Sequence, residues 1–128
     1  MGNSGSLLTA CYEKNTEKAL TLLEKSDINI NEVDVNGNTT LIWACKNKMN
    51  SVAMKLLNRP DINVNQVNKN GETALILACE NKMESVALKL LERPDINVNQ
   101  VNKDEKTALH WARENEMNNI VRIIMSKN

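Results

Sequence analysis

The stretch NGETALILACENKMESVALKLLERPDINVNQVNK occupies positions 70–103, and NGNTTLIWACKNKMNSVAMKLLNRPDINVNQVNK occupies positions 36–69 directly before it. The two stretches differ at only seven of their 34 positions. A period of this length is typical of proteins that stack one supersecondary unit several times. Weaker copies precede and follow, and we divide the chain into repeats at 1–35, 36–69, 70–103 and 104–128.

Each repeat has the pattern of two short helices and a loop. In the third repeat Thr73 is a predicted N-cap, and apolar residues at i, i+3 and i+4 predict a helix over 74–82. A second helix is predicted over 84–92, because Pro94 prevents it from continuing. An alternating segment, 95–99, then leads to a turn, and the Asn-Gly pair in the earlier copy of this turn is typical of a hairpin tip.

Two short helices and a projecting hairpin cannot bury their apolar faces alone, so such a fold exists only as an array of layers. The sequence therefore predicts an all-α repeat solenoid with short β-hairpin loops, which forms a single domain over 1–128. Polar residues replace buried or turn residues at four positions of the terminal repeats: Lys18 in the first, and Glu105, Arg113 and Arg122 in the last. We therefore interpret the first and last repeats as caps.

Charge and composition argue against several classes of function. Sixteen acidic and sixteen basic residues give no net charge, whereas nucleic-acid binding needs clustered Lys and Arg. His110 is the only histidine, and we favour a structural hydrogen bond for it over a catalytic or metal-binding role. The four glycines form no phosphate-binding loop. We expect a non-enzymatic protein with no cofactor, metal or small-molecule substrate, and with no nucleic-acid partner.

Cys11, Cys45 and Cys79 occupy the same position in three successive repeats. Equivalent positions in adjacent layers lie too far apart for a disulfide, so we interpret these side chains as small, buried and unpaired. Free thiols fit a reducing compartment, which predicts an intracellular, cytoplasmic protein and leaves a nuclear location open. No apolar run approaches the length of a membrane span.

Three segments carry a resemblance to the ankyrin-repeat family, whose signature is T-P-L-H-x-A. They are TTLIWA at 39–44, TALILA at 73–78 and TALHWA at 107–112. The chain departs from the family pattern because it lacks the proline, has the histidine once, and carries one residue more per repeat than the usual number of about 33. The resemblance implies a stack of helix pairs that binds protein partners on its concave face.

By this resemblance, partner contacts are expected at the hairpin tips and at the ends of the first helix of each repeat. The predicted tip residues are Asn36, Asn38, Lys69, Asn70, Glu72, Lys103, Asp104 and Lys106. The predicted helix-end residues are Tyr12, Glu13, Lys46, Asn47, Glu80, Asn81, Glu114 and Asn115. For Trp43 and Trp111 we favour packing over partner contact, because Leu77 occupies the same position in the third repeat.

Two further patterns have competing interpretations. Asparagine recurs in the segment after each helix pair, where it can bond its own backbone or the neighbouring layer, and we favour this structural use. The differences between the second and third repeats include Asn38/Glu72 and Lys46/Glu80 on the expected concave side. Tuning for a ligand would explain them, but we favour drift at solvated positions.

We predict a monomeric protein–protein interaction module that binds a protein partner through its concave groove, as an adaptor or a steric inhibitor. One alternative is a membrane-associated regulator, because the first six residues match the N-myristoylation pattern M-G-x-x-x-[ST] and would place an acyl chain on Gly2. An expression scar, or a leader whose Ser4 or Ser6 caps the first helix, explains the same residues. The other alternative is a structural repeat segment without a ligand of its own.

Overall fold

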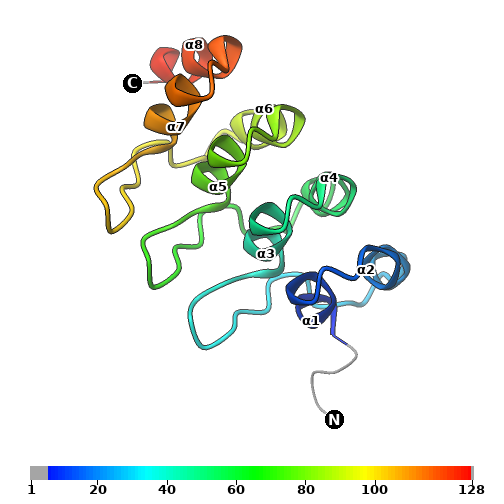
Figure 1. The fold of residues 1–128 in the computed structure, drawn as a ribbon. Coiled ribbons are helices and arrows are strands. Elements are labelled where there is room, and N and C mark those ends of the chain that lie inside the picture. The colour runs from blue at the N-terminus through cyan, green and yellow to red at the C-terminus, as the bar shows by residue number, and fades with distance from the viewer. Residues whose placement is uncertain (1–5, 128) are drawn as a thin grey trace.

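The computed structural model describes residues 6–127, and within that range the chain forms eight helices in four consecutive pairs. The first helices of the pairs are α1 (Leu7–Tyr12), α3 (Thr40–Lys46), α5 (Ala74–Glu80) and α7 (Ala108–Glu114). The second helices are α2 (Thr16–Leu23), α4 (Asn50–Leu57), α6 (Glu84–Leu91) and α8 (Asn118–Ser126). Figure 1 shows the pairs stacked as layers from one end of the molecule to the other, which confirms the predicted solenoid.

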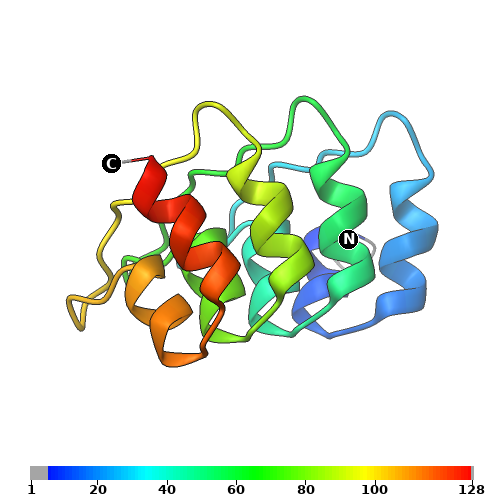
Figure 2. The same cartoon turned by 90° about the horizontal axis from the view of Figure 1, so that it is seen from above.

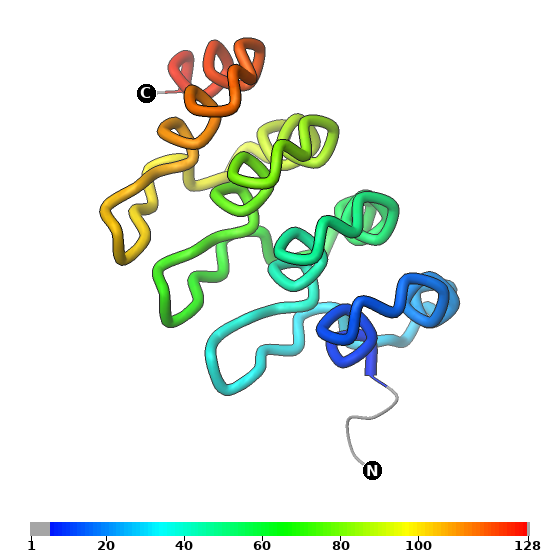
Figure 3. The backbone as a smooth tube through the Cα atoms, in the orientation of Figure 1, coloured from blue at the N-terminus to red at the C-terminus, as the bar shows by residue number. Residues whose placement is uncertain are grey.

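The helices form two rows. The first helices α1, α3, α5 and α7 pack on one another in that order and form the inner row, while α2, α4, α6 and α8 form the outer row. Figure 2 shows the outer row from above. The loops between layers all project to the same side, beyond the inner row (Figure 3). We call the surface bounded by these loop tips and the C-terminal ends of the inner helices the concave face.

Hydroxyl side chains begin the inner helices. Oγ1 of Thr39, Thr73 and Thr107 accepts a hydrogen bond from the backbone N–H three residues later, at 3.1, 3.2 and 3.3 Å. Ser6 Oγ caps α1 in the same way, at 3.0 Å from Thr9 N. Each of these caps satisfies a helix N–H that has no partner within the helix. The N-cap predicted at Thr73 is confirmed.

The helices of the third repeat end slightly earlier than predicted. α5 ends at Glu80 instead of continuing to 82, because Lys82 has φ +57° and a left-handed residue cannot continue a right-handed helix. Lys14 and Lys48 have the same left-handed conformation in the two preceding layers. α6 ends at Leu91. The break between the helices of a pair is therefore a property of one backbone position that recurs in every layer.

Small side chains let the layers approach each other closely. The alanines and cysteines of the inner helices, including Ala44 and Cys45, are fully buried. All three cysteines are buried and unpaired, as the sequence predicts. Burial, with smaller contributions from the neighbouring Cys79 and Cys11, raises the pKa of Cys45 to about 12. The thiols are therefore neutral packing groups.

The loops reverse direction without forming a β-hairpin ladder. The described residues contain no strand, and the one bridge recorded is an isolated pair between Val33 and Thr39. In the loop between α4 and α5, Asn68 Oδ1 accepts the backbone N–H groups of Asn70 and Glu72, both at 2.9 Å. A side chain thus satisfies tip amides that would otherwise need a strand partner. The turn predicted from the Asn-Gly pair forms. The hairpin-like loop around it has no strands, and the Asn68 side chain holds its tip by hydrogen bonds.

Asparagine and arginine side chains also connect each layer to the next. Asn65 Nδ2 donates to Asp95 O at 2.8 Å, and Asn65 Oδ1 accepts from Asn97 N at 2.9 Å. Arg93 Nη2 donates to the carbonyl oxygens of Leu57 and Arg59 in the layer before, at 2.7 and 2.9 Å. The structural use predicted for the asparagines of this segment is confirmed.

Glycine is required at the loop tips only where another loop follows. Gly37 and Gly71 have φ of +82° and +76°, and a Cβ on either would lie 2.9 Å from a backbone Cα of the next loop. Glu105 occupies the equivalent place in the last loop, with φ +63°. Glu105, Arg113 and Arg122, interpreted from sequence as capping residues, are all exposed. Gly2, the predicted acylation site, and Ser4 lie outside the described residues.

Candidate functional site

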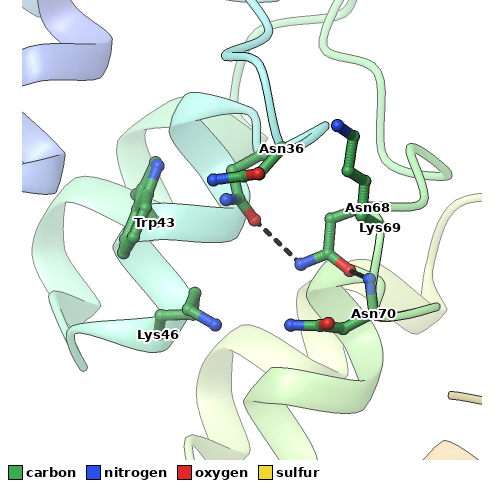
Figure 4. A pocket seen from close by; sticks show the side chains of 7 residues that line it. Asn36, Trp43, Lys46, Asn68, Lys69 and Asn70 are labelled. Atoms are coloured by element: carbon green, nitrogen blue, oxygen red, sulfur yellow. Dashed lines mark hydrogen bonds between the residues drawn. The ribbon is translucent and has the colours of Figure 1, made fainter. Parts of the chain in front are cut away.

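A cavity of about 310 Å³ opens on the concave face, between two successive loops and the end of α3. We call it the groove pocket. Its lining comes from the loop before α3, from α3 itself and from the loop before α5, and consists of Asn36, Asn38, Trp43, Lys46, Asn68, Lys69 and Asn70. Figure 4 shows these side chains facing one another across the pocket. The lining is dominated by carboxamides, with one indole and two ammonium groups.

Trp43 forms the aromatic side of the groove pocket. Its Nε1 donates to Asp34 Oδ2 at 2.9 Å, which fixes the plane of the indole. The Tyr12 ring meets it edge to face, with ring centroids 5.0 Å apart, and Lys46 Nζ lies 5.6 Å from the indole centroid. Tyr12 is 59 % exposed, whereas Trp43 is half-buried. Trp43 therefore packs against its neighbours, as we expected, and also lines the candidate site.

Asp34 holds the loop tip beside this indole. Its Oδ1 accepts the backbone N–H groups of Asn36 and Asn38, at 3.0 and 2.9 Å. Burial alone would raise the pKa of Asp34, but the hydrogen bonds from Trp43, Asn38 and Asn36 outweigh burial and lower the pKa. The Asp34 carboxylate is thus ionised, and both of its oxygens accept hydrogen bonds from the protein.

An ion pair joins the helix side of the groove pocket to the next loop. Lys46 Nζ lies 3.3 Å from Glu72 Oε1, and the lysine side chain is the more exposed of the two. Asn68 Nδ2 donates to the same Glu72 oxygen at 2.9 Å and to Asn38 Oδ1 at 2.8 Å. Burial and the nearby charge of Glu72 raise the pKa of Glu80, while Lys46 lowers it. Glu72 and Glu80 of the third repeat therefore interact electrostatically with each other, and Glu80 also interacts with Lys46 of the layer before.

The structure gathers five of the sixteen predicted contact residues around the groove pocket: Asn36, Asn38, Lys46, Lys69 and Asn70. Glu72 lies directly beside it through its pair with Lys46. Further along the concave face, the loop before α7 carries three predicted residues, of which Lys103 and Asp104 are exposed and Lys106 is half-buried. The helix-end residues Tyr12, Glu13, Glu80 and Glu114 are exposed.

The three remaining predicted residues are used within the stack. Asn47, Asn81 and Asn115 each donate their side-chain amide, at 2.8 Å, to the carbonyl oxygen at the cysteine position one layer earlier. Those oxygens belong to Cys11, Cys45 and Cys79. Each bond provides a partner for a carbonyl near the C-terminus of a helix, where the helix itself leaves carbonyls unpaired. These asparagines have a structural role that the sequence did not indicate.

Two lining residues were not predicted as contacts, namely Asn68 and Trp43. Asn68 was detectable in principle, because it lies 34 positions after Asp34 and precedes a predicted tip. The differences between the second and third repeats gave a second signal. Three of those seven positions contribute lining residues in the second repeat: Asn38, Trp43 and Lys46. The lining of the groove pocket therefore includes positions at which these two repeats differ.

The side chains brought together here are suited to binding. Among the described residues, no three His, Cys, Asp or Glu side chains form a group that could hold a metal ion. His110 lies away from the groove pocket, half-buried, with its ring edge to face on Trp111 at 5.0 Å. Across residues 6–127, no helix has both the length and the apolar character needed to span a bilayer.

A stack of helix pairs with a side-chain-lined groove defines the class of repeat-solenoid binding scaffolds. The family model for ankyrin repeats in three copies matches residues 7–102 and 55–128, so the chain belongs to the ankyrin-repeat family. Ankyrin repeats are generally protein–protein interaction modules, and the fold is typically a non-enzymatic scaffold.

Solved structures support the same fold. The crystal structure of EF0377, an ankyrin repeat protein, superposes with a TM-score of 0.79 at 24 % sequence identity. The match covers 98 % of this chain and 63 % of the other, so the chain spans less than two thirds of the length of that protein. No curated protein sequence matches the chain.

Proposed function

We propose that this chain binds a protein partner through its concave face, with the groove pocket at the centre of the interface, and that it acts as a monomeric, cytoplasmic adaptor or steric inhibitor. The observation that supports this most is the composition of the groove pocket. It combines an indole, two ammonium groups and four carboxamides in a hollow of about 310 Å³. Tryptophan and tyrosine are favoured at the energetic centres of protein interfaces, and Tyr12 and Trp43 adjoin here.

The rigidity of the loops supports the same proposal. Backbone hydrogen bonds tie successive tips together, from Lys69 N to Asn36 O and from Lys103 N to Asn70 O, both at 2.9 Å. A surface that is already ordered loses little conformational entropy when a partner binds. The expected activity of such a surface is to hold a partner or to block another protein from reaching it.

Site-specific photo-crosslinking in a lysate of the native source tests the proposal. A crosslinking amino acid is placed at Asn36 or Glu80 on the concave face, and, in matched controls, at Ser51 or Ser85 on the outer helices; all four are exposed. We expect one and the same protein to be captured from both concave positions and from neither outer position. Capture from the outer positions alone would contradict the proposal. Light scattering of the purified chain tests the monomeric state.

A charge-reversed chain provides the second readout. Lys46→Glu reverses the charge in the groove pocket and breaks the pair with Glu72, so circular dichroism and melting first check that the variant folds. It should abolish crosslinking from Asn36, since the only ammonium group on α3 lies in the groove pocket. Unchanged crosslinking would show that the partner does not enter the pocket.

A further inference from the structure

Two asparagine side chains on the loop tips are not used within the protein. Asn36 and Asn70 are exposed, and neither side-chain amide bonds another residue in the range 6–127. Figure 4 shows both carboxamides directed into the groove pocket, Asn36 on the side of Trp43 and Asn70 toward Lys46. Their neighbours Asn38 and Asn68, in contrast, are bonded to each other. The pocket therefore presents two open carboxamides, one from each layer.

Both open carboxamides are held on fixed backbones. Asn36 N donates to Asp34 Oδ1 at 3.0 Å, and Asn70 N donates to Asn68 Oδ1 at 2.9 Å. The carbonyl oxygen of Asn36 is bonded in turn by the backbone N–H of Lys69 in the next loop. The two side chains therefore start from equivalent, preorganised positions one layer apart.

We propose that Asn36 and Asn70 recognise the main chain of an extended segment of the partner that runs along the concave face, across the layers. A carboxamide has one acceptor oxygen and a donor NH₂ group, so it can pair with both the N–H and the C=O of one residue of the segment. The N–H and C=O of a single trans peptide group, in contrast, point in opposite directions. This inference rests on the proposed function. It adds to that function the conformation of the bound segment and the atoms by which it is held.

The spacing of the layers fits such a segment. Packed helices lie about 8–10 Å apart, and an extended segment of the polyproline II type rises about 3.1 Å per residue with three residues per turn. Asparagines one layer apart would thus meet residues about three apart, which such a segment presents on the same side. In the third tip Asp104 replaces the asparagine, and a carboxylate can accept from a main-chain N–H but cannot donate to a C=O. The two-sided contact is therefore restricted to the tips at Asn36 and Asn70.

The partner's side chains would be distinguished by the rest of the groove pocket. Trp43, Lys46 and Lys69 line the same pocket as the two carboxamides. Main-chain contacts at two points fix the register of the segment, and these side chains then select the residue that enters between them.

Backbone N-methylation of a selected peptide tests the inference. A displayed library of random, unstructured peptides is selected against the folded 1–128 chain, and the tightest binder is synthesised with a single N-methyl group at each position in turn. N-methylation removes the N–H donor of a contacted residue and places a methyl group against the carboxamide, so we expect affinity to fall about tenfold at two positions about three residues apart. N-methylation elsewhere should change affinity by less than about threefold.

Variants of the chain assign each contact. Asn36→Ala and Asn70→Ala should each weaken peptide binding about tenfold. The N-methyl group at the peptide position facing the altered asparagine should then have no further effect, as in a double-mutant cycle. The matched control is Asn58→Ala, because Asn58 is an exposed asparagine at the end of α4, away from the concave face. Circular dichroism and melting confirm that all variants fold.

The outcomes separate this inference from the proposed function. If Lys46→Glu abolishes peptide binding but the N-methyl effects do not couple to Asn36 or Asn70, the main-chain contact is overturned while groove binding stands. If no peptide is selected, or if groove variants leave binding unchanged, recognition of an extended segment is overturned. The crosslinking experiment then decides separately whether a folded partner uses the concave face.

Discussion

The second and fourth repeats both place a tryptophan at the same position of the inner helix, and the two indoles have different partners. Trp43 Nε1 donates to Asp34, whereas Trp111 Nε1 is buried and has no partner among the described residues. Two repeats after Asp34 the chain has Asn102, whose Oδ1 accepts two loop-tip amides as Asp34 Oδ1 does. Asparagine thus replaces aspartate in holding the loop, but it lacks the second carboxylate oxygen that the indole needs.

A second difference between these repeats is the presence of a following layer. In the second repeat, Gly37 lies under the next loop and Cys45 is fully buried between layers. In the fourth repeat, Glu105 and Arg113 occupy those positions and are exposed. The comparison shows that the next layer, more than the local helix pattern, decides which residue a position tolerates. Substitutions at matched positions of the repeats test this conclusion.

The largest effect is expected at the cysteine position. Under native conditions Cys45 should react with iodoacetamide at least roughly 10³ times more slowly than a thiol introduced by Arg113→Cys, since its alkylation requires opening of the stack. Site-resolved mass spectrometry after short labelling times measures both rates in one sample. Comparable rates at 45 and 113 would show that the layers separate easily, contrary to the burial of Cys45.

The same thiol predicts a loss of stability at alkaline pH. Because burial raises the folded pKa of Cys45 from 9.0 to about 12, its contribution is complete below pH 9.0 and is lost as the pH rises toward about 12. Urea unfolding of the wild type should weaken over this window by up to about 1.4 kcal/mol per pH unit for each such thiol. Cys45→Ala serves as the control and should show a shallower dependence.

Gly37→Ala should be the most destabilising single change at the loop tips. The left-handed φ of +82° is unfavourable for alanine, and the new Cβ would meet the Asn68 Cα at 2.9 Å. We expect a loss of about 3 kcal/mol in the free energy of unfolding. The matched change is Glu105→Ala, which alters a left-handed residue at an exposed tip and should cost less than about 0.5 kcal/mol. Equal costs in urea unfolding would remove the role assigned to the next layer.

Exchanging the acceptors of the two indoles should give smaller, opposite effects. Asp34→Asn should cost about 1–2 kcal/mol by removing the acceptor of the Trp43 indole, while Asn102→Asp should stabilise by about 1 kcal/mol by providing one for Trp111. Chemical denaturation at neutral pH measures both changes. Destabilisation by Asn102→Asp would show that the added charge outweighs the indole bond.

The dependence of folding stability on acidic pH tests the hydrogen bond between Asp34 and Trp43. Because the folded pKa of Asp34 is lowered below 3.8, its contribution is complete above that value and is lost as the pH falls through the folded pKa. The wild type should therefore lose stability in this acidic window, and Asp34→Asn should lose less. Parallel pH curves would contradict a stabilising role for the ionised carboxylate.

A feature could be predicted from the sequence where it arises within one repeat, and not where it depends on how two layers align. Helix positions, the Thr73 cap and the buried cysteines were predictable because periodicity, capping and side-chain size act within one repeat. The role of Asn47 was not, because its bond to the Cys11 carbonyl depends on how two layers align. The expected hairpin loops form as tight turns without strands, since an asparagine side chain bonds the tip amides.

The candidate site was predictable only in part for the same reason. The family resemblance pointed to Lys46 and Asn70 on the concave face, and both line the groove pocket. Trp43 was assigned to packing because Leu77 is its counterpart, although an indole is long enough to be packed at one edge and to line a cavity with the rest. Which of the carboxamides remain unbonded depends on distances between loops that the sequence does not contain.

The smallest effect is expected at Thr40, the first residue of α3. Its Oγ1 is buried without a hydrogen-bond partner among the described residues, and Ala74 and Ala108 are the equivalents in later repeats. Thr40→Ala loses a buried methyl group but relieves the unpaired hydroxyl and favours the helix, which gives a net gain of up to about 1 kcal/mol. Thr40→Val keeps the shape and removes only the hydroxyl, so it should stabilise as well. If both variants are less stable than the wild type in urea unfolding, the hydroxyl has a partner and the second repeat gains from its threonine.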